Sequence, residues 1–135
     1  MINIIYGGEG SGKTAKLISL ANEAVDSAKG ILVYIDKNNS KMHVLDHTIK
    51  LLDLVELGIC NVEQFIAFIK GMVSGNYDIQ TVYVDNLEKI TGKTANEFET
   101  LFNQLETLVN VLRVNFVITI GCNETTLPEY IKKYI

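Results

Sequence analysis

Residues 2–14 read INIIYGGEGSGKT, a short apolar run that leads directly into the pattern Gly-x-x-x-x-Gly-Lys-Thr. Gly7, Gly10 and Gly12 allow the backbone to curl until successive N–H groups point at one anion, and the helical pattern that follows adds the positive end of a helix dipole. Lys13 can reach the β- and γ-phosphates of a nucleotide, and the Thr14 hydroxyl can ligate Mg²⁺. The stretch therefore predicts a phosphate-binding loop made of Gly8, Glu9, Gly10, Ser11, Gly12, Lys13 and Thr14.

The composition fits one domain without a nucleic-acid-binding surface. The chain has 135 residues, 47% of them hydrophobic, which is enough to bury one core. Acidic residues outnumber basic ones by 16 to 12, and the one adjacent basic pair is Lys132-Lys133. Binding to nucleic acid requires clustered Lys and Arg, so it is not expected. We expect a single nucleotide-binding domain over residues 1–135.

The sequence carries no sign of a membrane segment. The first apolar run begins at the second residue, and no apolar run approaches the roughly 18 residues that span a bilayer. Cys60 and Cys122 lie far apart and belong to no metal-binding motif, which suits reduced thiols. These features predict a cytoplasmic protein without a membrane partner.

Apolar runs alternate with helical patterns along the whole chain, which predicts an α/β fold. The runs are short and continuous, as in strands buried on both faces of a parallel sheet. Right-handed crossovers then place helices on both faces. We expect a three-layer α/β/α fold with a mainly parallel five-stranded sheet. Its strands are expected at 2–6, 31–35, 49–52, 81–85 and 115–120, although residues 51–57 would also pass as a helix. The main helices are expected at 17–28, 61–75 and 94–112, before a short terminal helix that Thr126 and Glu129 cap.

Polar residues at the ends of these strands are the other candidates for a site, because ligands of parallel sheets bind at the carboxyl ends of strands. Asp85 ends an apolar strand and is expected to hold Mg²⁺ together with Thr14; the alternative is an Asp that only caps a turn. Asn123 follows the last strand. It is a candidate contact for the γ-phosphate, or else a residue that supports the turn.

The order of these elements resembles that of the RecA-like P-loop ATPases. Residues 7–14 match their phosphate loop, 31–36 their second strand, 49–52 the next strand and 82–85 their Walker B strand. The chain also looks like a group of short bacterial ATP-binding proteins with no assigned role. The resemblance implies a RecA-like strand order, ATP as the nucleotide and Mg²⁺ as the metal.

The sequence departs from that family at the catalytic carboxylate. A Glu that polarises the attacking water is expected directly after Asp85 or shortly after residue 36, and the chain has Asn86 and Lys37-Asn38 there. Loss of a general base lowers rates by about 10²- to 10⁴-fold. Hydrolysis is therefore expected to be slow unless Asp36, Glu88 or Glu124 substitutes. Asp36 is the preferred substitute, acting with Lys13, and a turn-starting Asp is its structural alternative.

Three functions fit these residues. The first is a weak Mg²⁺-dependent ATPase or nucleotide switch that orders its loops for an unknown protein partner. The second is a small-molecule kinase, against which stands the absence of an Arg-rich segment that could close over the phosphates. The third is a binding module that holds nucleotide without turnover.

The first strand raises a question of assembly. In the expected order, residues 2–6 form an edge strand with unpaired backbone groups and little charge to protect it. Either the apolar terminal segment 130–135 folds back over that edge or a second subunit covers it, which leaves a homodimer open.

Overall fold

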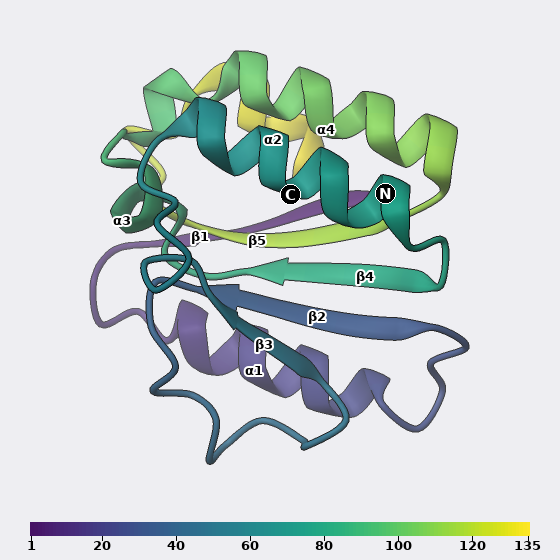
Figure 1. Ribbon diagram of the computed structural model, residues 1–135. Helices are drawn as coiled ribbons and strands as arrows, with labels where there is room; N and C mark the ends of the chain where they lie inside the picture. Colours follow the sequence, from purple (N-terminus) through teal and green to yellow (C-terminus); the bar gives the residue numbers. More distant parts are fainter.

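Five parallel strands form one sheet in the order β1-β5-β4-β2-β3 (Figure 1). The computed structural model describes residues 1–135. The strands are β1 (Ile2–Gly7), β2 (Ile31–Asp36), β3 (Lys50–Asp53), β4 (Ile79–Val84) and β5 (Asn115–Gly121). Every neighbouring pair is parallel. The predicted five-stranded parallel sheet is confirmed, and β1 lies at one edge of it.

Helices cover both faces of the sheet, so the molecule has three layers. Helix α1 lies on one face, and α2 and α4 lie side by side on the other (Figure 1). None of the helices has the length and apolar character that crossing a bilayer requires. The helices are α1 (Lys13–Ala24), α2 (Val62–Gly75), α3 (Leu87–Thr91) and α4 (Glu99–Leu112), with 3₁₀ turns η1 (Ala95–Glu97) and η2 (Glu129–Tyr134).

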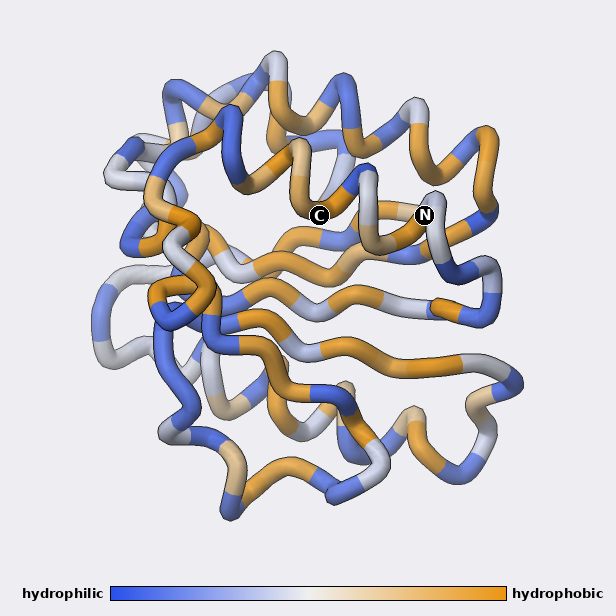
Figure 2. The backbone as a smooth tube through the Cα atoms, viewed as in Figure 1, coloured by the Kyte–Doolittle hydropathy of each residue, from blue (hydrophilic) through white to orange (hydrophobic).

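Both faces of the central strands are buried, as their continuous apolar runs predict. In β2, Val33 and Ile35 join a core of 28 buried residues beneath α2 and α4, whereas Leu32 and Tyr34 join a cluster of seven beneath α1. Hydrophobic residues accordingly concentrate along the sheet and on the inner sides of the helices (Figure 2). Most of the buried hydrophobic residues therefore lie on the face under α2 and α4.

The third strand begins one residue later than expected. The sequence suggested 49–52, but β3 is Lys50–Asp53, with Lys50 beside Val33 and Asp53 beside Asp36. Ile49 instead belongs to the preceding turn, where its N–H donates to the Asp46 carbonyl over 3.0 Å. A local turn thus sets the start of this strand.

The bounds of three helices differ from the expectation. Helix α1 is Lys13–Ala24 and not 17–28, because it begins directly after the loop and residues 25–27 form a turn. The predicted capping box of Thr94 and Glu97 forms, but it caps η1, and α4 begins only after the buried Phe98. The predicted cap of Thr126 and Glu129 is wrong, because Thr126 bonds the Asn123 side chain and Pro128 precedes η2. The short helix α3 was not expected at all.

Candidate functional site

The loop between β1 and α1 has the backbone that its glycines predict. Gly10 and Gly12 have φ angles of 79° and 86°, in the left-handed region that favours glycine. The Ser11 N–H donates to the Gly8 carbonyl over 3.2 Å and closes a turn. A Cβ atom at Gly7 would collide with the Ser11 side chain, so any larger residue there would require Ser11 to move. Residues 8–12 are exposed, and their backbone is open to a ligand.

The Lys13 side chain crosses this loop. Its Nζ donates to the Gly8 carbonyl over 3.3 Å, and the residue is half-buried. A phosphate oxygen is a stronger partner for an ammonium group than a neutral carbonyl is, because both partners are then charged. Lys13 is therefore placed to bind an anion that enters the loop.

Asp85 follows β4 and is fully buried. Its Oδ1 accepts from the Thr14 hydroxyl over 3.2 Å and from the Thr119 hydroxyl over 2.7 Å, and the Asn86 N–H donates to it over 3.1 Å. Its Oδ2 accepts from the Tyr34 hydroxyl over 3.4 Å. The structure thus joins Thr14 to Asp85, although 71 positions separate them in the sequence.

The Tyr34 phenol is held in its neutral, donating form. Burial is the main reason that its pKa lies well above the ordinary value, and the negative charges of Asp85 and Asp36 raise it further. A neutral phenol can donate to Oδ2 but cannot offset the charge of the carboxylate. All the donors around Asp85 are neutral, so this buried carboxylate has no cationic partner within the protein.

This donor set fits a hard divalent cation. A carboxylate and a hydroxyl are ligands that Mg²⁺ takes, and Mg²⁺ usually completes its shell with water and phosphate oxygens. The chain has no group of three or more His, Cys, Asp or Glu side chains that could hold a metal by themselves. Asp85 and Thr14 together therefore suit a metal that arrives with a nucleotide better than a metal bound by protein alone.

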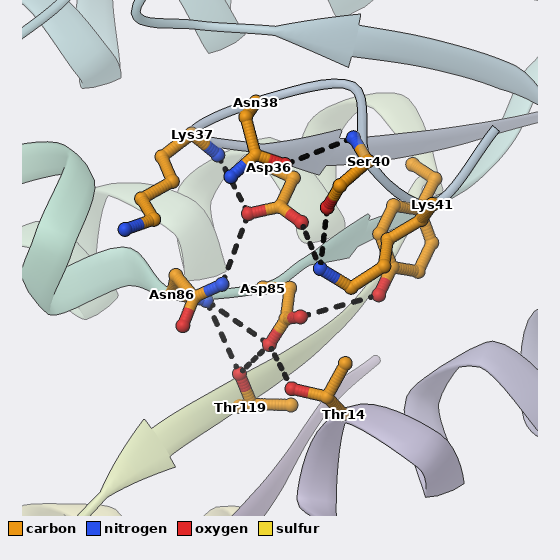
Figure 3. A network of polar contacts seen from close by, with 10 residues as sticks. Thr14, Asp36, Lys37, Asn38, Ser40, Lys41, Asp85, Asn86 and Thr119 are labelled. Carbon is orange, nitrogen blue, oxygen red and sulfur yellow. Dashed lines mark hydrogen bonds and ion pairs between the residues drawn. The ribbon is translucent and has the colours of Figure 1, made fainter.

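Asp36 follows a different pattern at the end of β2. It is fully buried, and its Oδ1 accepts from the Lys37 N–H over 2.7 Å and from the Asn86 Nδ2 over 3.0 Å. Its Oδ2 forms an ion pair of 3.2 Å with Lys41 Nζ (Figure 3). The carboxylate is therefore neutralised and bonded on both oxygens.

A pocket of about 540 Å³ opens beside the loop. It brings loop residues together with the ends of β4 and β5 and with α3, which is the arrangement that ligand sites of parallel sheets adopt. Asp36 does not line it. The lining residues are Gly8, Glu9, Lys13, Asn86, Glu88, Lys89, Thr94, Gly121, Cys122, Asn123 and Thr126.

Asn123 lines this pocket while it also supports the turn after β5. Its Oδ1 accepts from the N–H groups of Thr125 and Thr126, each over 3.0 Å. Its Nδ2 makes no hydrogen bond and is the part of the side chain that a ligand could use. The two alternatives for Asn123 are thus compatible within one side chain.

Sequence reasoning missed several side chains of this site. Tyr34 and Thr119 interrupt apolar strands, and a lone polar residue in such a strand was the available signal. Lys41 carried no signal, because it lies in a polar loop and meets Asp36 only through the fold.

Comparisons with known proteins agree with this architecture. The sheet order, the three layers and the loop before α1 define a RecA-like P-loop fold. Among solved structures, the chain is similar to a KaiC-like protein from the hyperthermophilic archaeon Pyrococcus horikoshii OT3, with a TM-score of 0.65 and 15% sequence identity. The similarity covers 98% of this chain and 68% of the archaeal one. No protein-family model and no curated protein sequence matches the chain.

Proposed function

We propose that this protein binds ATP together with Mg²⁺ and hydrolyses it slowly, as a weak ATPase or a nucleotide switch that acts on a protein partner. The exposed N–H groups of residues 8–12 and the start of α1 would hold the phosphates. Lys13 would bind the β- and γ-phosphates in place of the Gly8 carbonyl.

One observation carries the proposal. Directly behind a glycine-rich loop, a hydroxyl and a buried carboxylate that no cation neutralises lie 3.2 Å apart. Burial of an unpaired charge is costly, so such a group persists where a cation offsets it for at least part of the working cycle. Thr14 and Asp85 would hold Mg²⁺, which would neutralise charge on the phosphates.

Calorimetric titration of ATP with and without Mg²⁺ tests this site. Asp85→Asn should remove most of the extra affinity that Mg²⁺ confers and leave metal-free nucleotide binding intact. Asp46→Asn is a matched control, because Asp46 is half-buried in a turn outside the pocket, where its carboxylate bonds Thr48 and lies 3.7 Å from the ring of the exposed His47. An equal loss of affinity in the presence and absence of Mg²⁺ would argue against the metal role.

A single-turnover assay separates hydrolysis from phosphoryl transfer. Phosphate release that is independent of any acceptor supports the ATPase, and loss of ATP only with an added small-molecule acceptor supports a kinase. Binding without either reaction would leave a nucleotide-binding module. The polar pocket beside the loop makes the acceptor panel worthwhile, since it extends from Lys13 to Thr94 and Thr126.

A further inference from the structure

Three carboxylates could replace the missing catalytic Glu, namely those of Asp36, Glu88 and Glu124. They differ in burial, in hydrogen bonding and in whether they line the pocket. Asp36 is fully buried, bonded on both oxygens and absent from the pocket wall. Glu124 is exposed and also does not line the pocket. Glu88 alone among the three lines the pocket together with Lys13.

The backbone conformation at Asn86 determines that Glu88 lies beside the pocket. Asn86 has a left-handed φ of 61°, and α3 begins immediately after it. A Glu directly after Asp85 would therefore occupy the turn itself, whereas Glu88 lies in the first turn of α3. Its Oε1 accepts the Gly121 N–H over 2.6 Å, which ties α3 to the end of β5.

This bond places the carboxylate near the phosphate loop. Gly121 is the register partner of Gly7, the last residue of β1 before the loop. Neighbouring strands lie about 4.8 Å apart, so the bonded carboxylate lies close to the mouth of the loop. Its Oε2 makes no hydrogen bond within the protein and is free to accept a proton.

We propose that Glu88 is the general base of the ATP hydrolysis proposed above, on which this inference rests. Oε2 accepts a proton from the attacking water as the water oxygen forms its bond to the γ-phosphorus. The bond between the γ-phosphorus and the β–γ bridging oxygen breaks, and ADP leaves with that electron pair. The proton later passes to solvent, so the overall reaction is ATP and water to ADP and phosphate.

The Gly121 N–H orients the Glu88 side chain. It fixes one oxygen of Glu88 and so holds the carboxylate, which lines the pocket, in one orientation. A fixed orientation is what makes a side chain an effective base. Gly121 therefore acts as a positioning residue through its backbone.

The test is Glu88→Gln in the full chain. Glutamine keeps an oxygen that can accept the Gly121 N–H but cannot take up a proton. Single-turnover hydrolysis should fall by about 10²- to 10⁴-fold, while MgATP affinity and melting temperature stay near those of the wild type. Glu124→Gln removes the same charge from an exposed neighbouring loop and should leave the rate unchanged.

The thiol of Cys122 provides a second readout that does not depend on turnover. Burial and then the charge of Glu88 raise the pKa of this thiol, while Lys13 lowers it. In a Cys60→Ser background, Glu88→Gln should lower the pH at which Cys122 reacts with an alkylating reagent. Bound MgATP should protect the thiol, because Cys122 lines the same pocket.

The outcomes separate this inference from the proposed function. A wild type that hydrolyses ATP and a Glu88→Gln variant that does so equally fast overturn the role of Glu88 and leave the ATPase standing. A wild type that binds MgATP without turnover also overturns the role. A wild type that does not bind MgATP overturns both proposals.

Discussion

Two buried carboxylates lie at neighbouring strand ends, and their surroundings differ in one respect. Asp36 has a cationic partner in Lys41, whereas Asp85 has only neutral donors. A buried charge that is paired and bonded serves the fold, and one that lacks a counter-ion is suited to binding a cation. These surroundings favour a structural role for Asp36 and support the cation-binding role proposed for Asp85.

Replacing Lys13 with Ala should weaken MgATP binding by about 1.5–3 kcal/mol, because a charge-assisted contact with the phosphates is lost. Calorimetric titration measures the change directly. Lys16→Ala is the control, since Lys16 is exposed one turn further along α1. Unchanged affinity in Lys13→Ala would mean that the loop does not hold the nucleotide as proposed.

The sequence could predict the loop and the position of Asp85, because both are encoded locally. The glycines, Lys13 and Thr14 form one contiguous motif, and Asp85 ends a recognisable strand. The preference for Asp36 over Glu88 as the catalytic carboxylate could not be judged in this way. Which of two carboxylates lines a pocket depends on the turn at Asn86 and on the bond to Gly121, and both arise from tertiary structure.

A network of polar contacts links the end of β2 to the end of β4. Asn86 donates through its side chain to Asp36 and through its backbone to Asp85. Lys41 reaches Asp36 from the loop after β2 (Figure 3). The loop that follows β2 is thereby linked to the candidate metal carboxylate through two hydrogen-bonded residues.

Lys41→Met should lower the free energy of unfolding, toward the lower end of the range of about 3–5 kcal/mol for an orphaned buried charge, because Asp36 keeps two other donors. Urea denaturation provides the measurement. Adding Asp36→Asn to Lys41→Met should restore part of the loss, since the uncompensated charge is then gone.

Lys37→Met is the matched control for this network. Lys37 bonds Asp36 only through its backbone N–H, which the substitution keeps. If Lys37→Met and Lys41→Met cost the same stability, the ion pair is not what holds the loop.

The elements show where local patterns suffice and where they do not. The apolar strands were recognisable because burial on both faces demands continuous apolar runs. Helix α3 has five residues and begins after a left-handed Asn, so no periodicity could reveal it. The start of β3 was predicted one residue too early because Ile49 belongs to the turn that begins at Asp46.

The C-terminal segment lies beside the edge strand β1. The turn η2 contacts β1, and Ile131 and Tyr134 are buried. The Phe102 ring of α4 packs against Tyr130 and Tyr134, with ring centroids 6.1 and 5.5 Å apart. The predicted fold-back of residues 130–135 toward β1 is thus present, and the homodimer stays a prediction.

Deletion of residues 130–135 should destabilise the protein or change its association state, since it removes buried side chains and uncovers β1. Ile131→Ala isolates the packing contribution and should cost about 2–5 kcal/mol. Ile135→Ala is the control, because Ile135 is 59% exposed. Calorimetry and mass in solution check both, and a truncated chain with unchanged melting temperature and mass would refute this role.

The position of the strands also has a consequence for amide hydrogen exchange. β4 is paired on both sides, while β1 pairs only with β5, so β1 should open locally at a lower free energy than β4. A nucleotide held by the loop after β1 and by Asp85 after β4 would be released whenever β1 opened. MgATP at 100 times its Kd should therefore raise the free energy of local opening of β1 by up to about 2.7 kcal/mol, which slows exchange of the β1 amides that bond β5. Exchange of the amides in the middle of β4 should change only through the global stability of the protein.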